Sequence, residues 1–275
     1  MNAASPLIDT NVHLSNWPFR HLEGSNPKSL AQALRRQNVR VACVGSFDAI
    51  LHRDIDGVNR RLVEACGGTR ASKDREHVAW LPFGTVHLGL PDWQEDVRRC
   101  HERYHMRGIR IYPNYHQYSL DGTAAMAFFA ECHRRGLVVQ IVMSLEDRRT
   151  QHPLVRVPAV DPNSLLPAVR RYPDLPLMLL NAFRETPVGK LEPLVRAGRL
   201  YVELATLERA AGLERLVNVI PASRICYGSN APLFYPSAAR RKLQAAAIGE
   251  AQRRAIASGN VLALERLMIP DAEGF

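Results

Sequence analysis

Short runs rich in apolar and β-branched residues recur along the chain, and stretches with helical spacing of apolar positions separate them. Most of the runs are nearly continuous in apolar residues, which is typical of strands buried on both faces of a parallel sheet. The predicted strands are 7–13, 39–47, 78–87, 108–112, 137–143, 177–183, 200–205 and 225–228. The predicted helices include 28–37, 56–65, 94–104, 123–135, 163–171, 189–197 and 210–219. Strands that alternate with helices favour right-handed βαβ units.

These segments predict a single (β/α)8 barrel of the α/β class over residues 1–275, with its core at about 7–265. A barrel of this kind commonly takes about 250 residues, so the length leaves little room for a second domain. The alternative is a doubly wound sheet. It is disfavoured because no glycine-rich dinucleotide or phosphate loop follows the first predicted strand.

Two connections are longer than the others. Residues 67–76 are polar and predict an exposed loop, and the tail from residue 266 to 275 is expected to be frayed. Residues 144–161 follow the fifth predicted strand and include Glu146, Asp147 and His152. Long loops after barrel strands usually cover or bind ligands, so the second connection is predicted to be a lid or a binding loop.

The excess of basic residues consists mainly of arginine. There are 36 basic and 27 acidic residues, which gives a net charge of +9. The arginines form doublets along the whole chain, several of them late in predicted helices, where cations stabilise the helix C-terminus and face water. A nucleic-acid-binding protein would gather them in one block or stripe with aromatic residues between. We therefore expect a solvated, arginine-rich surface and no nucleic-acid partner.

Cysteine usage and hydropathy indicate the compartment. The five cysteines are odd in number and form no CxxC pair, which suits a reducing cytosol rather than a disulfide framework. The first residues lack the pattern of a signal peptide, and no apolar run approaches the roughly 20 residues that span a bilayer. A soluble cytoplasmic protein without membrane contact is expected.

Polar side chains gather where the predicted strands end. In a (β/α)8 barrel, catalytic side chains come from the C-terminal ends of the strands, and a period of two selects those that face inward. Asp9, Asn11 and His13 share one face of the first strand by this rule. The later strands contribute Arg110, Tyr112, Gln140, Asn181, Glu203 and Asn230. The predicted site lies at this mouth of the barrel.

Arg110 is the most telling of these side chains, because a barrel interior excludes an unpaired guanidinium. Either it pairs with Asp9 or Glu203, or it grips a ligand carboxylate. Glu203 is correspondingly the partner of Arg110 or a base. His13 is either a hydrogen-bonded structural residue or an acid–base catalyst.

Aromatic residues mark the loops that follow the first and fourth strands. His116 and Tyr118 lie in a tyrosine-rich segment after the fourth strand, which either closes over a flat or carboxylic ligand or forms a surface turn. Trp17, after the first strand, is interpreted as aromatic packing beneath a loop, with a pocket wall as the alternative. His87 ends the third strand, where it could reach the mouth.

Five segments carry a family resemblance through their order and spacing. They are Ile-Asp-Thr-Asn-Val-His at 8–13, Gly-Ile-Arg-Ile-Tyr-Pro at 108–113, Tyr-Pro-Asp-Leu at 172–175, Arg-Ile-Cys-Tyr-Gly-Ser-Asn-Ala-Pro at 224–232 and Ala-Ser-Gly-Asn-Val at 257–261. The chain resembles the amidohydrolase superfamily over about 7–264, in particular the amidohydrolase-related branch that includes aromatic-acid decarboxylases and lactonases. The resemblance implies the same barrel fold.

The resemblance also implies a metal site from which this sequence departs. Family members carry an HxH pair on the first strand, single histidines ending the fifth and sixth, and an aspartate ending the eighth. These side chains hold a divalent metal, such as zinc, that activates water. Here the matching positions are Asn11, Val142 or Met143, Asn181 and Asn230, and only His13 of the HxH pair remains. We therefore expect no metal cofactor and no metal-hydroxide mechanism.

The resulting hypothesis is a metal-independent hydrolase or lyase for a small substrate that bears a carboxylate: a lactone, an amide or an aromatic acid. Some lactonases of the family act without a metal, which the resemblance makes relevant here. The catalytic candidates are His13, Glu203 and Asn230. The substrate-binding candidates are Asp9, Asn11, Arg110, Tyr112, His116, Tyr118, Gln140 and Asn181. In this scheme His13 or Glu203 acts as base and the asparagines polarise a carbonyl.

Two further possibilities concern the role of the asparagines and the partners. The asparagines either hydrogen-bond a substrate or form an amide network that replaces the lost metal. The alternative function is a catalytically inactive subunit that binds a ligand or regulates a metal-bearing paralogue. A homodimer is a further expectation, by analogy with the fold.

Overall fold

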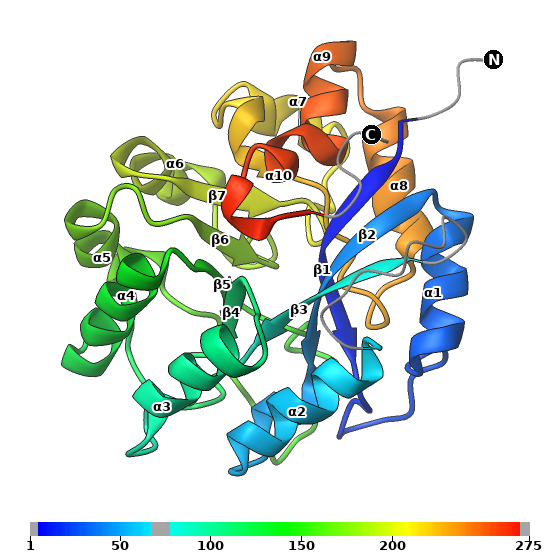
Figure 1. The fold of residues 1–275 in the computed structure, drawn as a ribbon. Helices are drawn as coiled ribbons and strands as arrows, with labels where there is room; N and C mark the ends of the chain where they lie inside the picture. The colour runs from blue at the N-terminus through cyan, green and yellow to red at the C-terminus, as the bar shows by residue number, and fades with distance from the viewer. Residues whose placement is uncertain (1–4, 68–77, 270–275) are drawn as a thin grey trace.

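Eight parallel strands close into one barrel with the helices outside it (Figure 1). The computed structural model describes residues 5–67 and 78–269. The strands are β1 (Leu7–Leu14), β2 (Val39–Ser46), β3 (Ala79–Gly84), β4 (Gly108–Ile111), β5 (Val138–Val142), β6 (Leu177–Leu180), β7 (Leu200–Glu203) and β8 (Ile225–Cys226). They pair in sequence order, and backbone hydrogen bonds from Thr10 to Tyr227 (3.0 Å) and from His13 to Ala231 (2.8 Å) join the two ends. The predicted (β/α)8 barrel is confirmed.

The helices begin and end at residues that favour such boundaries. They are α1 (Pro27–Arg36), α2 (Ile55–Ala65), α3 (Trp93–Arg98), α4 (Thr123–Arg135), α5 (Leu166–Arg171), α6 (Val188–Ala197), α7 (Gly212–Val217), α8 (Pro236–Ala245), α9 (Glu250–Arg254) and α10 (Asn260–Leu262). The Asn26 side chain accepts a hydrogen bond from the Ser29 amide at the start of α1. Gly136 ends α4 with a φ of 67°, a left-handed conformation that glycine adopts without steric cost.

Several predicted helices differ from the observed ones. Segment 94–104 is α3 followed by a π-helical turn, Arg99–Arg103, and segment 163–171 is a 3₁₀ turn, Pro162–Leu165, followed by α5. Helix α7 is shorter than the predicted 210–219. No helix was predicted after residue 219, where α8, α9 and α10 lie.

The strands separate two apolar regions. Ile8, Tyr112 and Val142 belong to the cluster that fills the barrel interior. Met143 belongs to the larger cluster between the strands and the helices. Because neighbouring strand residues point to opposite sides, the inward position at the end of β5 is Val142 and not Met143.

Strand β1 interrupts the alternation predicted for its inner face. Asp9 faces Ala42 and Val12 faces Val44, so β1 uses three steps where β2 uses two. An extra residue of this kind is a β-bulge, which re-aims the side chains around it. Ile8 accordingly packs inside the barrel, whereas Leu7 belongs to the cluster between the strands and the helices.

The C-terminal segment returns to the N-terminal end of the barrel. Leu264 and Leu267 are buried in the interior cluster, and Leu267 lines a hollow with Phe83 of β3 and with residues 105–107, which precede β4. The expectation of a frayed tail is therefore wrong at its start, and residues 270–275 lie outside the described chain. The loop predicted at 67–76 also lies outside it from residue 68 onward.

Arginines of the doublets pair on helix surfaces. Arg98 pairs with Glu95 at 2.7 Å, and Arg134 pairs with Glu131 at 2.6 Å. Such pairs three or four residues apart occur on solvated helix faces. In the described part of the chain, no helix has the length and apolar character needed to cross a bilayer.

Candidate active site at the barrel mouth

Three asparagines and one glutamate form a buried hydrogen-bonded network where β1, β6, β7 and β8 end. Asn11 Nδ2 donates to Asn181 Oδ1 at 2.9 Å and to Glu203 Oε1 at 3.2 Å. Asn181 Nδ2 donates to Asn230 Oδ1 at 3.2 Å, and Asn230 Nδ2 donates to the Leu145 carbonyl at 3.3 Å. Asn181 and Asn230 both have a φ of 57°, which asparagine tolerates better than most residues. The asparagines thus form a network of amides bonded to one another, which was one of the two predicted arrangements. Both hydrogens of Asn11 Nδ2 are donated within this network, so neither is free to polarise a substrate carbonyl.

Glu203, the last residue of β7, accepts hydrogen bonds from this network and from two backbone amides. Its Oε1 accepts the Asn181 amide hydrogen at 2.6 Å, and its Oε2 accepts that of Ala205. Burial raises the pKa of Glu203, and the hydrogen bonds from Ala205, Asn181 and Asn11 oppose that rise. A Cβ at Gly228 would lie 2.5 Å from Glu203 Oε2, so glycine provides the space for the carboxylate.

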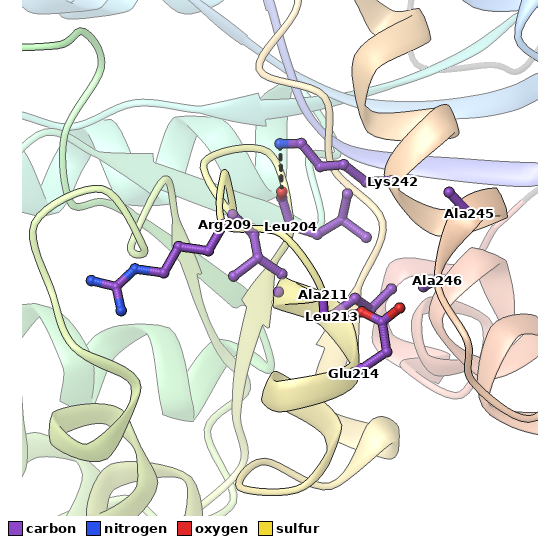
Figure 2. A pocket seen from close by; sticks show the side chains of 10 residues that line it. Leu204, Arg209, Ala211, Leu213, Glu214, Lys242, Ala245 and Ala246 are labelled. Atoms are coloured by element: carbon purple, nitrogen blue, oxygen red, sulfur yellow. Dashed lines mark hydrogen bonds between the residues drawn. The ribbon is translucent and has the colours of Figure 1, made fainter.

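Lys242 supports Glu203 from outside the barrel. It reaches from α8 to the loop after β7, where Nζ donates to the carbonyl of Leu204 at 3.3 Å (Figure 2). It also donates to the carbonyl of Ala205. A cavity of about 150 Å³ lies beside it. Burial lowers the pKa of Lys242, and the nearby charge of Glu203 opposes that effect. Lys242 thus stabilises the loop whose Ala205 amide binds the glutamate.

His13 is fully buried near the end of β1. Its ring stacks on Phe47 with centroids 4.6 Å apart and planes 1° apart. Neither ring nitrogen has a hydrogen-bond partner among the described residues. Burial, and secondarily the charge of Arg110, hold the pKa of His13 well below its ordinary range. The ring is therefore a neutral imidazole with both nitrogens available.

Arg110 does not form the ion pair with Asp9 or Glu203 that was one of its two predicted contacts. Its Nε donates to Gln140 Oε1 at 2.8 Å, and its terminal nitrogens donate to the carbonyls of Val12 (2.7 Å), Cys43 (3.1 Å) and Thr10 (3.4 Å). Within residues 5–67 and 78–269 no carboxylate lies at ion-pair distance, so pairing with Asp9 or Glu203 is excluded there. Neutral carbonyls solvate the cation instead.

The surroundings of Arg110 are built to hold it. Gln140 also donates from Nε2 to the Thr10 carbonyl at 2.8 Å, which fixes its amide. A Cβ at Gly45 would lie 2.8 Å from Arg110 Cδ, so glycine makes room for the side chain. Burial lowers the pKa of Arg110, although an arginine remains charged. The guanidinium therefore affects the mouth through its positive charge and not through direct hydrogen bonds to a ligand.

Asp9 braces the two strands at which the barrel closes. Its Oδ1 accepts the amide hydrogens of Asn11 and Ser229, each at 3.0 Å. Its Oδ2 is buried without a partner in the described part of the chain. Burial raises the pKa of Asp9 to about 7, against the hydrogen bonds from Ser229 and Asn11. Asp9 thus joins β1 to the segment after β8 through Oδ1, and its Oδ2 is left without a partner among the described residues.

In the loop after β4, the rings of Tyr112, His116 and Tyr118 pack next to one another. Tyr112 Oη donates to the Ser46 carbonyl at 3.3 Å, and His116 Nε2 lies 2.8 Å from the Ala49 carbonyl. The His116 ring stacks on His87 at 4.0 Å and lies 6.3 Å from that of Tyr118. Burial raises the pKa of Tyr112 to about 12 and lowers that of His116 to about 4. Tyr112 and His116 are buried, so the loop packs its rings against the barrel end and is not a simple surface turn.

Trp17 is packed as predicted, and its indole nitrogen has no hydrogen-bond partner among the described residues. Its side chain is 3% exposed and packs edge-on against Phe47, with centroids 5.0 Å apart. Its Nε1 is buried and finds no acceptor among the described residues, although buried indoles usually have one. Asn11 Oδ1 is likewise unpartnered. Within the described part of the chain, Trp17 therefore has a free donor and Asn11 a free acceptor, and Trp17 and His13 both pack against the Phe47 ring.

The sequence profile of the amidohydrolase family matches residues 8–264. The chain belongs to the amidohydrolase family. A search of the curated proteins gave no match.

Solved structures with the same barrel include three decarboxylases. This amidohydrolase-family protein superposes on 2,6-dihydroxybenzoate decarboxylase from Rhizobium with a TM-score of 0.68 and 14% identity, over 96% of this chain and 99% of the other. The dihydroxybenzoic acid decarboxylase from Polaromonas sp. JS666, which contains manganese and 2-nitroresorcinol, gives 0.72 and 14%, over 98% and 99%. The 5-carboxyvanillate decarboxylase from Sphingomonas paucimobilis gives 0.70 and 11%, over 95% and 99%.

The mouth of this amidohydrolase-family protein does not fit a divalent metal. Zinc and manganese need imidazole or carboxylate donors. Asn11, Asn181 and Asn230 offer neutral amides that are bound to one another, and Val142 offers no donor. Over the described ranges, no group of three or more His, Cys, Asp and Glu side chains is arranged to hold a metal ion.

Proposed function

We propose that the protein is a metal-independent enzyme that acts by proton transfer at His13 on a small substrate bearing a carboxylate. The observation that carries this proposal is the buried, neutral His13 ring with two unpartnered nitrogens. A buried polar atom without a partner costs about 1–3 kcal/mol, so an occupant that completes these hydrogen bonds is favoured. Imidazole is also the usual acid–base group near neutral pH.

Hydrolysis of a lactone or an amide is the reaction best supported. A neutral imidazole accepts a proton from an attacking water molecule, which is the role of a general base. The free N–H of Trp17 is placed to bind an oxygen of the substrate. The buried charge of Arg110 favours an anionic group at the mouth, since no carboxylate among the described residues pairs with it.

Decarboxylation is the second candidate, because the three structural neighbours above are decarboxylases. That reaction ends with protonation of the carbon that loses carbon dioxide. The lowered pKa of His13 keeps its ring neutral, so it would take up a proton more readily than it would supply one.

A substrate panel tests the proposal. Carboxylated lactones, carboxylated amides and 2,6-dihydroxybenzoate are incubated with protein dialysed against EDTA. Turnover that survives dialysis and falls at least about a hundredfold in His13→Gln supports the proposal. Turnover that requires added manganese or zinc overturns metal independence, and full activity in His13→Gln overturns the role of His13. Binding of a panel member without turnover indicates the inactive ligand-binding alternative.

A further inference from the structure

Two loops meet over the barrel mouth. One follows β1 (residues 15–26) and the other follows β5 (residues 144–161). Arg20 of the first loop forms an ion pair with Glu146 of the second, and the Phe19 and His152 rings lie 6.3 Å apart at the same junction. The Arg20 side chain is 42% exposed and that of Glu146 is 3% exposed. Water therefore reaches this contact from the arginine side.

Arg184, in the loop after β6, holds the β5 loop from the opposite side. Its guanidinium donates to Asp147 at 2.9 Å and to Glu208 of the loop after β7 at 2.8 Å. The same group lies 5.4 Å from the centre of the Phe234 ring, after β8. Adjacent acidic residues of the β5 loop are thus bound by arginines from two other loops.

Among the described residues, polar atoms without partners belong to Asn11 and His13 at the mouth and to Trp17 in the β1 loop itself. Asn230, at the floor of the mouth, donates to the carbonyl of Leu145, which directly precedes Glu146. Asn11 and His13 are fully buried and Trp17 nearly so. Because His13 is fully buried, a ligand reaches its nitrogens only if part of the surrounding structure moves, and the two loops are the longest segments at this end of the barrel.

We propose that residues 15–26 and 144–161 form a lid over His13, fastened by the Arg20–Glu146 and Arg184–Asp147 ion pairs. The Arg20–Glu146 pair is exposed on the arginine side, so it contributes little to stability and suits a contact that opens repeatedly, whereas the less exposed Arg184–Asp147 pair holds the β5 loop more firmly. Loop closure of this kind excludes water from a reaction and gates access to it. The proposal concerns access to His13 and holds whether or not His13 is the catalytic base.

Modification of His13 by diethyl pyrocarbonate tests the lid without a substrate. The reagent attacks neutral imidazole, and mass spectrometry of the His13 peptide gives the rate. We expect slow reaction in the wild type and roughly three- to fivefold faster reaction in Arg20→Ala and in Glu146→Gln. Raising NaCl from about 0.1 to about 1 M shortens the screening length from about 10 to about 3 Å, so the wild-type rate also rises.

Arg149→Ala is the matched control. Arg149 also binds Asp147, at 2.7 Å, but it belongs to the same loop and is 87% exposed, so its loss leaves the His13 rate unchanged. His133, exposed on α4, reports the activity of the reagent in every sample. Equal His13 rates in wild type, Arg20→Ala and Glu146→Gln, or no reaction in any of them, overturn the lid. Should a variant fail to fold, the salt dependence of the wild type decides: a flat profile rejects the proposal.

Discussion

At the barrel mouth, some polar residues donate their hydrogen bonds within the protein, and others keep a free donor or acceptor. Arg110 directs its hydrogen bonds to carbonyls and Gln140, and Asn11 spends both amide hydrogens on Asn181 and Glu203. His13 and Trp17 keep buried nitrogens that no described residue satisfies. The residues that remain available for a ligand are therefore fewer than the polar residues that line the strand ends.

Trp17→Phe tests whether the indole N–H serves a ligand. The change keeps an aromatic ring and removes a donor that bonds to nothing described, so the free energy of unfolding should change by less than about 1 kcal/mol. The kcat/KM for the substrate found by the panel should fall about tenfold. Urea denaturation and steady-state kinetics measure the two effects. Trp93→Phe, in α3 and away from the mouth, should leave kcat/KM unchanged, and an equal loss in both variants would argue against the role.

Asp9 predicts a pH dependence of stability. Its pKa rises from 3.8 to about 7 on folding, so the folded state binds more protons between these values. The contribution of this carboxyl is present below about pH 4 and is lost as the pH rises through 7. Asp9→Asn does not titrate, so its stability relative to wild type should increase by up to about 4 kcal/mol from pH 4 to pH 8.

Urea denaturation of both proteins at several pH values gives the difference directly. His13 titrates in the opposite sense, because its lowered pKa makes its contribution decline below pH 6.5. That effect is common to both proteins and cancels in the difference. A difference that is constant with pH would show that the Asp9 carboxyl ionises normally in the folded protein.

At the scale of elements, local signals placed the helices better than the ends of the strands. Helix α4 spans Thr123–Arg135, as predicted, because Gly122 and Gly136 flank it. Strand β6 ends at Leu180, although 177–183 was predicted, and β7 ends at Glu203 rather than at 205. The apolar pattern continues past the last ladder hydrogen bond, because the residues that follow are buried at the mouth.

Gly45→Ala tests how β2 accommodates Arg110. The new Cβ would lie 2.8 Å from Cδ and 2.9 Å from a terminal nitrogen of Arg110. A crowded, hydrogen-bonded guanidinium cannot move freely, so the variant should lose about 1–3 kcal/mol of stability. Gly189→Ala in α6 meets no atom within 4 Å and should be neutral or slightly stabilising. Thermal denaturation of the pair compares them, and equal melting temperatures would contradict the tight fit.

At the scale of the whole molecule, the barrel brings together side chains from strands far apart in the sequence. The positions that resemble a metal site come from β1, β5, β6 and β8. Replacing all of them with metal-binding residues therefore tests whether each strand is assigned in the correct register. If one strand were misassigned, one metal-binding side chain would be missing from the site.

The combined variant Asn11→His, Val142→His, Asn181→His and Asn230→Asp should bind about one manganese or zinc ion per chain after dialysis. Imidazole and carboxylate supply the donors that the amides lack. Elemental analysis measures the metal, with the wild type and Asn11→His alone as controls that should retain little. Metal retained by the wild type would contradict the assignment of these positions, and none in the combined variant would contradict their register.

The sequence by itself determined the barrel and the residues at its strand ends, because apolar periodicity and the order of strands and helices are written along the chain. The family resemblance of the sequence also predicts which metal donors are replaced. Only the tertiary structure decided which polar groups are used up, because their partners are distant in sequence. Asn11 and Asn181 are 170 residues apart, and Arg110 and the Val12 carbonyl are 98 apart. Such contacts depend on how the barrel closes and on a bulge in β1, which local patterning does not encode.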